Sequence, residues 1–159
     1  MGSNPTRGTD VATLSINEKF FSQWTSEMSY VLGVIAADGY LGIKQVGKRG
    51  NIQYFLDITS KDFKLLKKIK EAMKAQQKIG IKHRGRKKKS YRLQIGSQKI
   101  CKDLLTLGIR PRKTFTLDTI NVPEEYFSDF LRGFFDGDGS VYIYKVNGTP
   151  QIKAKIISR

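Results

Sequence analysis

Cysteine and histidine are almost absent from this chain, which has one of each in 159 residues. A structural zinc site needs about four such ligands, so the sequence argues against one. The single cysteine, Cys101, excludes a disulfide within the chain and favours an intracellular compartment, the cytoplasm or an organelle matrix. Long hydrophobic runs are also missing: none approaches the roughly 20 residues of a membrane span, and residues 1–10 lack the apolar segment of a signal peptide.

Negative charge is scarce as well. The chain has 14 Asp and Glu residues against 29 Lys and Arg, which gives a formal net charge of +15. This excess suits a polyanionic partner, and nucleic acid is favoured over an acidic membrane surface. A hydrophobic content of 39% still supports a packed core. We therefore expect a nucleic-acid-binding protein of one ordinary domain or two small ones.

A nine-residue segment occurs twice, one hundred positions apart. Residues 31–39 read Val-Leu-Gly-Val-Ile-Ala-Ala-Asp-Gly, and residues 131–139 read Leu-Arg-Gly-Phe-Phe-Asp-Gly-Asp-Gly. Each copy is typical of an apolar helix, ended by Gly39 or Gly139 in a left-handed conformation. Gly33 and Gly133 lie mid-helix, where glycine costs about 1 kcal/mol relative to alanine. We expect a compensating gain from close contact between the backbones of the two helices.

Each copy also carries an acid at its C-terminal end, Asp38 in the first and Asp138 in the second. The helix dipole disfavours an anion there by roughly 0.3–1 kcal/mol. If the helices pair in parallel, the two carboxylates also repel each other. A divalent cation relieves both effects, and paired acids that hold such cations suit phosphodiester cleavage. An ordinary amphipathic core helix is the alternative for one copy alone, whereas two matched copies favour the metal site.

These segments resemble the motif after which the LAGLIDADG homing endonucleases are named. The second copy is the closer match, because the first has Ala36 where the motif has its first Asp. The resemblance covers the chain from about residue 20 onward. It implies a site-specific double-stranded DNA endonuclease, a hydrolase of phosphodiester bonds that reads a long site with paired β-sheets and requires Mg²⁺.

The resemblance also implies roles for individual residues. Asp38 and Asp138 are the expected metal ligands and catalytic acids, whereas Asp136 and Ala37 are given no such role. Residues 108–114 resemble the family's segment that delivers a lysine to the active site, which makes Lys113 the expected cation near the scissile phosphate. An exposed basic loop is the alternative for this segment.

Between the two copies, hydrophobic periodicity predicts an α+β unit with one sheet. Strands are expected around residues 40–44, 52–59, 78–82 and 90–95, with a turn at residues 48–51. Helices are expected to begin at Ser26, at Thr59 or Ser60, at Ser97 and at Glu124. A last hairpin should follow the second copy, with a turn at residues 147–148. This order matches the LAGLIDADG fold, an αββαββα half-domain plus the first αββ of a pseudo-symmetric second half.

Three segments are expected along the chain. Residues 1–18 form a disordered leader or cloning remnant, residues 19–118 a complete half-domain, and residues 119–159 an incomplete one. Residues 151–159 align with residues 53–61, after which the first copy continues through a helix, a hairpin and a helix. We interpret the second half as truncated and expect self-association through its uncovered apolar residues.

A sheet that binds DNA should be polar or basic on its front face. The residues that fit this role are Lys44, Gln53, Lys82, Arg84, Arg92, Gln94, Lys153 and Lys155, with Arg86, Lys87, Lys88 and Lys89 at a basic hairpin tip. Arginine and glutamine suit base edges, whereas lysines mainly hold phosphates. The tip could instead be a solubilising strand edge. His83 is expected as a turn residue or phosphate contact, and Cys101 as a core residue.

Three alternatives stay open. The chain could be a relative that binds DNA or RNA without cleavage, as a splicing cofactor or regulator, or a general RNA-binding domain, or an inactive fragment. The presence of both acids favours the endonuclease. Residue 1 is not Cys or Ser and there is no terminal His-Asn, so an intron-encoded or free-standing enzyme is favoured over an intein.

Overall fold

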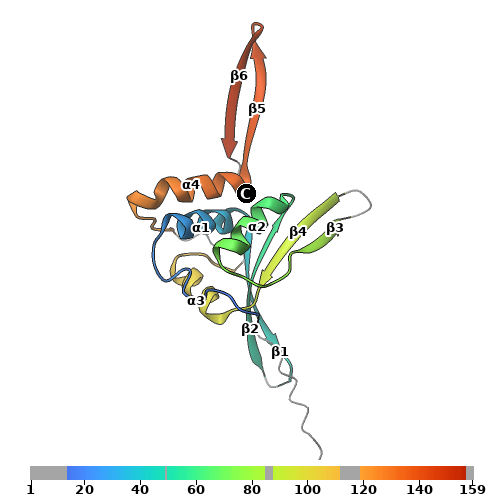
Figure 1. Cartoon of the computed structure of the whole chain (residues 1–159), viewed down its shortest axis with the longest axis vertical. Helices are drawn as coiled ribbons and strands as arrows, with labels where there is room; N and C mark the ends of the chain where they lie inside the picture. The colour runs from blue at the N-terminus through green and yellow to red at the C-terminus, as the bar shows by residue number, and fades with distance from the viewer. Residues whose placement is uncertain (1–13, 49, 85–87, 112–118, 157–159) are drawn as a thin grey trace, which may run out of the picture.

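The structure, a computed structural model, describes residues 14–48, 50–84, 88–111 and 119–156, and for Arg84 and Lys88 only the backbone (Figure 1). The elements are α1 (Ser26–Asp38), β1 (Gly39–Val46), β2 (Asn51–Ser60), α2 (Phe63–Ala72), β3 (Gly80–Arg84), β4 (Lys88–Ile95), α3 (Gln98–Thr106), α4 (Glu124–Asp138), β5 (Gly139–Val146) and β6 (Thr149–Ile156). The α+β class and the predicted order of helices and hairpins are confirmed. No helix in the described ranges is long and apolar enough to cross a bilayer.

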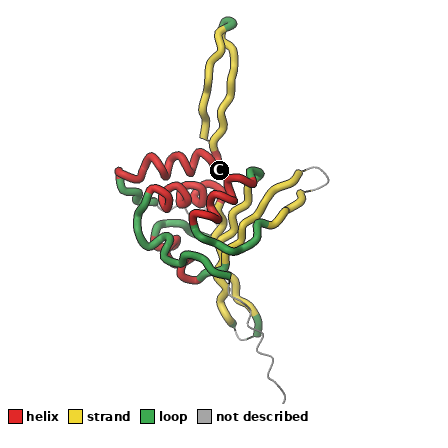
Figure 2. Tube along the Cα trace, in the orientation of Figure 1, coloured by secondary structure: helices red, strands yellow, loops and turns green. Residues whose placement is uncertain are grey.

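The first four strands form one antiparallel sheet in the order β1-β2-β4-β3, and β5 and β6 form a separate hairpin. The back of the four-stranded sheet packs against the helices, where Leu56, Ile58, Leu93 and Ile95 are fully buried. Figure 2 shows the helices gathered beside this sheet, with the β5–β6 hairpin projecting away from them. The core therefore lies between Phe20 and Ile109, in the first copy of the repeat.

The helices contribute a large part of the core. Helix α1 is buried from Met28 to Ala36, and α3 contributes Ile100, Cys101 and Leu104. Cys101 is a core residue, as predicted. Ser97 caps α3 by accepting a hydrogen bond from the Ile100 amide, and α4 begins at Glu124, also as predicted.

The predicted cap of α2 is wrong. Thr59 and Ser60 lie in β2, because they pair with Arg92 and Tyr91 of β4 and stay extended. The cap is Asp62, whose Oδ1 accepts hydrogen bonds from the amides of Lys64 at 2.8 Å and Leu65 at 3.3 Å. Strand pairing therefore moves the start of the helix by two or three residues.

Gly39 and Gly139 are also not left-handed, contrary to the sequence-based expectation. Their φ angles are −78° and −77°, which any residue can adopt. Glycine is needed there for space, because a Cβ on Gly39 would lie 2.7 Å from the carbonyl oxygen of Ile35. A Cβ on Gly139 would lie 2.5 Å from Cδ2 of Phe135. Each strand can therefore leave its motif helix without an intervening loop.

Phe55 of β2 occupies space left open by a glycine of β1. It lies on the polar face of the sheet, yet it is 7% exposed. Its partner across the β1–β2 ladder is Gly42, and a Cβ there would lie 2.5 Å from Phe55 Cε2. The glycine thus provides the space that the aromatic ring occupies.

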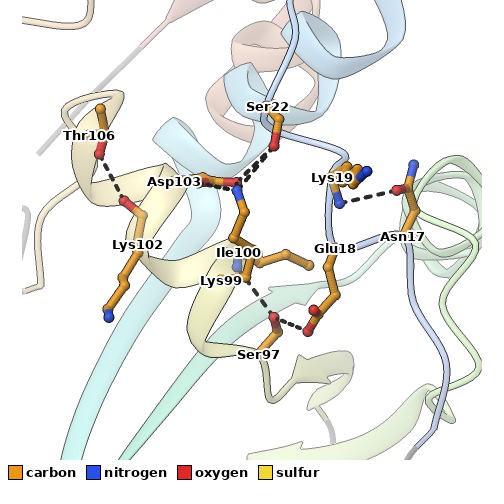
Figure 3. Close-up of polar contacts among 10 residues, drawn as sticks. All are labelled: Asn17, Glu18, Lys19, Ser22, Ser97, Lys99, Ile100, Lys102, Asp103 and Thr106. Atoms are coloured by element: carbon orange, nitrogen blue, oxygen red, sulfur yellow. Dashed lines mark hydrogen bonds and ion pairs between the residues drawn. The ribbon is translucent and has the colours of Figure 1, made fainter.

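The N-terminal segment is held against α3 by polar contacts (Figure 3). The Ser97 hydroxyl donates to Glu18 Oε1 at 2.9 Å, and Lys99 Nζ donates to Ser22 at 3.1 Å and to Asp103 at 2.6 Å. These contacts begin within the predicted leader. The division of the chain into three segments stays a prediction.

Candidate metal and nucleic-acid site

The site is built on the contact between α1 and α4, which lie side by side and run parallel (Figure 1). A Cβ on Gly33 would lie 2.8 Å from the Phe134 amide nitrogen, and one on Gly133 would lie 2.8 Å from the Tyr30 carbonyl carbon. The two backbones are therefore in direct contact, as the mid-helix glycines predict. Only residues without a side chain permit this approach.

Parallel packing brings the two acids to the same end of the helix pair. A Cβ on Gly137 would lie 2.5 Å from Ala37 Cβ and 3.7 Å from Asp38 Oδ2. Asp138 directly follows Gly137, and both Asp38 and Asp138 are half-buried. The helix dipoles of α1 and α4 add negative potential at this end. The arrangement is therefore suited to attract a cation.

Side chains on both helices fix their relative position. The Ser29 hydroxyl donates to the Tyr126 carbonyl oxygen at 2.8 Å, and the Tyr126 ring stacks on Trp24 at 6.0 Å between centroids. The Tyr30 hydroxyl donates to the Asp136 carboxylate at 2.6 Å. Asp136, which was given no metal role, thus serves the helix interface.

A cleft of about 640 Å³ opens beside the acidic end of the helix pair. Its lining residues are Asp38, Thr59, Ser60, Lys61, Lys82, Lys89, Ser90 and Gly137. A carboxylate and three lysines thus surround one space, which can accept a phosphate group together with a cation. The sequence predicts functional roles for Asp38, Lys82 and Lys89 but none for Lys61, because the predicted helix cap at Thr59 or Ser60 assigns Lys61 to the start of a helix. Extending the strand alternation through Ser60 would have placed Lys61 at the strand end.

The donor set fits a divalent cation that is shared with a substrate. Among the described residues, no group of three or more His, Cys, Asp or Glu side chains could enclose a metal ion. Mg²⁺ is usually bound by one or two carboxylates plus substrate phosphates, with several waters retained. Asp38 and Asp138 match that requirement, and Lys113 lies outside the described residues.

The strand registers place most predicted DNA-binding residues on one face of the four-stranded sheet, here called the front face. It includes Lys44 and Gln53, which pair with each other, and Gln94 and Lys82, all with exposed side chains. The backbone register also places Arg84 on this face. Arg92 lies there too, but its side chain bonds to Asp57.

The remaining predicted DNA-binding residues belong to the basic hairpin tip and to the β5–β6 hairpin. Lys89 pairs with His83, so its register assigns it to the opposite face, and its Nζ lies 5.1 Å from the centroid of the Tyr91 ring. Lys88 pairs with Arg84, and Arg86 and Lys87 lie outside the described residues. Lys153 and Lys155 are exposed on β6. His83 lies within β3, so the predicted turn position is wrong.

Comparison with known proteins gives matches in structure. No protein-family model matches the chain. No curated protein matches its sequence either. The chain is similar to the meganuclease I-SmaMI bound to uncleavable DNA, with a TM-score of 0.54 and 15% identity over 80% of this chain and 66% of that one. It is also similar to the LAGLIDADG meganuclease I-CpaMI bound to uncleaved DNA, with a TM-score of 0.50 and 15% identity over 83% and 66%.

A third similar structure is I-DmoI in complex with DNA and Mn, with a TM-score of 0.48 and 20% identity over 78% of this chain and 64% of that one. The chain thus spans 64–66% of the length of these proteins. The LAGLIDADG fold predicted from the repeated motif is confirmed.

Proposed function

We propose that this protein is a site-specific double-stranded DNA endonuclease that requires a divalent cation, with Mg²⁺ as the expected ion. The observation that carries the proposal is the position of Asp38 beside Gly137, the residue that precedes Asp138, at a cleft that three lysines also line. The DNA-bound state of the similar solved structures supports the choice of substrate. As part of the same proposal, we expect an intracellular enzyme of intron homing.

The residues of the site have different roles in this proposal. Asp38 and Asp138 would hold the cation, which when bound supplies positive charge at the scissile phosphate and lowers the pKa of a bound water. Lys61 lines the same cleft. Its positive charge would stabilise the negative charge that develops on the scissile phosphate. Lys44, Lys82 and Gln53 of the front face hold the duplex and keep the scissile bond at the cleft.

The test starts with a pool of random DNA duplexes, from which the wild-type protein selects binding sites without divalent metal. The selected duplex is then incubated with Mg²⁺ or with EDTA. We expect double-strand cleavage with Mg²⁺ only. Asp38→Asn and Asp138→Asn should abolish cleavage and leave affinity within a few-fold, because the neutral amide removes a metal ligand and also a repulsion from phosphate.

Asp136→Asn is the matched control. It makes the same chemical change on the same helix, two residues away, and the amide oxygen can still accept the Tyr30 hydrogen bond. This variant should cleave like the wild type. Undiminished cleavage by either metal-site variant would overturn the assigned roles.

A second candidate is a relative that binds nucleic acid without cleaving it. The observation in its favour is the front face, whose exposed Lys44 and Lys82 suit nucleic acid whether or not the acids hold a cation. The chain also exposes apolar side chains on α4, β5 and β6. Specific binding by the wild type with no cleavage at any Mg²⁺ concentration would support this candidate. We further propose that two copies of the chain associate through this apolar surface.

A further inference from the structure

One acid stands out on the front face of the sheet. Among the described residues of that face, Asp57 is the only carboxylate, in a protein with a net charge of +15. It lies on β2, between Tyr40 of β1 and Gln94 of β4. A carboxylate at this position repels DNA phosphates, so its presence calls for a compensating role.

Asp57 is bonded to Arg92 of the neighbouring strand. Arg92 Nε donates to Asp57 Oδ2 at 2.7 Å, and Nη2 of the same guanidinium contacts the same oxygen. The Thr59 hydroxyl donates a hydrogen bond to the other carboxylate oxygen, Oδ1, at 3.4 Å. The Asp57 side chain is 12% exposed, whereas that of Arg92 is 38% exposed. The pair is thus anchored at its acidic end and accessible at its basic end.

The pairing leaves a defined set of donors. A guanidinium group has five N–H bonds, of which Asp57 engages those on Nε and one on Nη2. The remaining donors are on Nη1 and Nη2, which form the edge that binds O6 and N7 of guanine in the major groove. Arg92 pairs across the ladder with Gly80, which has no side chain, and even an added Cβ there would lie no closer than 3.9 Å to another atom. The edge is therefore open on the β3 side.

The charge of the pair argues against phosphate binding. Arg92 and Asp57 together carry no net charge, so they release little counterion when DNA binds. A guanine edge is uncharged and needs well-oriented hydrogen-bond donors. Because Asp57 already restricts the Arg92 side chain, Arg92 loses less conformational entropy when it binds. A partly exposed ion pair contributes little to stability, so its effect on the fold does not explain its position on this face.

We propose that Asp57 positions Arg92 to read one guanine of the DNA target. Arg92 makes the base contact, and Asp57 acts through it as a positioning residue. The inference rests on the proposed function, since it requires that the protein recognises a DNA sequence.

The experiment is selection from a pool of random duplexes, followed by affinity measurements on the selected site with each base in turn. Wild-type protein is compared with Asp57→Asn and Arg92→Lys. For the wild type we expect guanine at one position of the selected site, where each other base weakens binding by about 10-fold to about 100-fold. Both variants should accept all four bases there within about 3-fold and keep the rest of the site. Asp57→Asn should also bind non-specific DNA more tightly, because it removes a negative charge from the front face.

Asp103→Asn is the matched control. Asp103 also pairs with a basic side chain, Lys99, and its substitution changes the net charge equally, but it lies on α3. It should leave the selected sequence unchanged. Thermal stability is measured for every variant, because a merely structural pair would change stability and not base preference.

Each outcome decides the inference. An unchanged guanine preference in Asp57→Asn, beside a clear wild-type site, would overturn it and leave the proposed function standing. Loss of the guanine in Arg92→Lys alone would assign the reading to Arg92 without Asp57. If the wild type enriches no sequence at all, the proposed function fails, and the inference fails with it.

Discussion

The hydroxyl group of Tyr30 on α1 donates a 2.6 Å hydrogen bond to the carboxylate of Asp136 on α4. Tyr30 is 3% exposed, and two cations lie over its ring: Lys68 Nζ is 3.8 Å and the Arg132 guanidinium 4.9 Å from the ring centroid. One tyrosine of α1 therefore connects three helices, through Lys68 of α2 and through Arg132 and Asp136 of α4.

Tyr30→Phe should destabilise the protein by about 1 kcal/mol, because it removes a hydrogen bond to a charged group while keeping the ring. This loss of stability is small for a hydrogen bond to a charged group, because the Asp136 side chain is exposed and its carboxylate stays hydrated. Urea denaturation measures the change. Tyr144→Phe is the control, because the Tyr144 hydroxyl bonds to Gln151 on the exposed hairpin. Equal stability of Tyr30→Phe and the wild type would contradict the role of the bond.

The same tyrosine predicts a pH dependence. Burial, followed by the hydrogen bond and charge of Asp136, raises the pKa of Tyr30 above its ordinary value of 10.0. Folding therefore favours the protonated phenol, whose contribution is complete below pH 10 and is lost as the pH rises further. The stability difference between wild type and Tyr30→Phe should shrink above about pH 10. A difference that grows with pH would contradict this assignment.

The two mid-helix glycines predict a larger effect. Gly33→Ala or Gly133→Ala should destabilise the fold by at least about 3 kcal/mol, since the new Cβ meets backbone atoms that cannot move aside. Gly96→Ala is the control, because its Cβ would lie 4.0 Å from the nearest atom outside the adjacent residues. Thermal unfolding measures all three variants. A folded Gly133→Ala with an unchanged melting temperature would contradict the close helix contact.

These outcomes show which features local sequence signals can predict. A glycine repeated in the middle of a helix indicates backbone contact without knowledge of the partner. The turn at Asn147 and Gly148 is also local, since both residues have positive φ angles in the structure. By contrast, the Asp57–Arg92 and Tyr30–Asp136 bonds join residues far apart in sequence, so they depend on strand register and helix packing. Lys61 was missed because β2–β4 pairing, a tertiary interaction, extends the strand.

The hairpin tip predicts a salt dependence. If its basic residues hold phosphates, log affinity should fall with log salt by about 0.9 for each phosphate neutralised. Replacing Arg86, Lys87, Lys88 and Lys89 with Gln should flatten the slope and weaken all DNA sequences about equally. The control replaces four exposed lysines of the helical side with Gln, namely Lys64, Lys67, Lys74 and Lys102. Identical slopes for the tip variant and the wild type would remove the tip from the interface.

Cys101 predicts slow thiol chemistry. Burial raises the pKa of this thiol from 9.0 to about 11, partly offset by a backbone hydrogen bond from Ser97. Because the thiolate is the reactive form, a disulfide reagent at pH 8 should label the native protein slowly and the urea-unfolded protein at once. The labelling rate should follow the unfolding rate as urea increases. Complete labelling of the native protein within seconds would contradict the buried position.

The last prediction concerns the apolar surface of α4, β5 and β6. Val141, Ile143 and Ile152 are 59%, 76% and 76% exposed. A groove of about 600 Å³ is lined by Leu131, Phe135, Ala154 and Ile156, among others. In the first motif helix, the residues that correspond to Leu131 and Phe135 are Val31 and Ile35, which are 1% and 0% exposed. The same surface is thus buried in one copy of the repeat and open in the other, and a contiguous exposed apolar patch favours association.

We expect the molar mass from light scattering to rise with protein concentration. Ile143→Lys combined with Ile152→Lys should keep the chain monomeric, because these residues pair across β5 and β6 and would place two charges on the apolar face. Tyr144→Lys combined with Gln151→Lys is the matched control: it changes the adjacent cross-strand pair, on the opposite face of the same hairpin. This control should associate like the wild type. A wild-type monomer at every concentration would show that the surface does not bind a second copy, whereas equal loss of association in both double variants would assign the effect to charge alone.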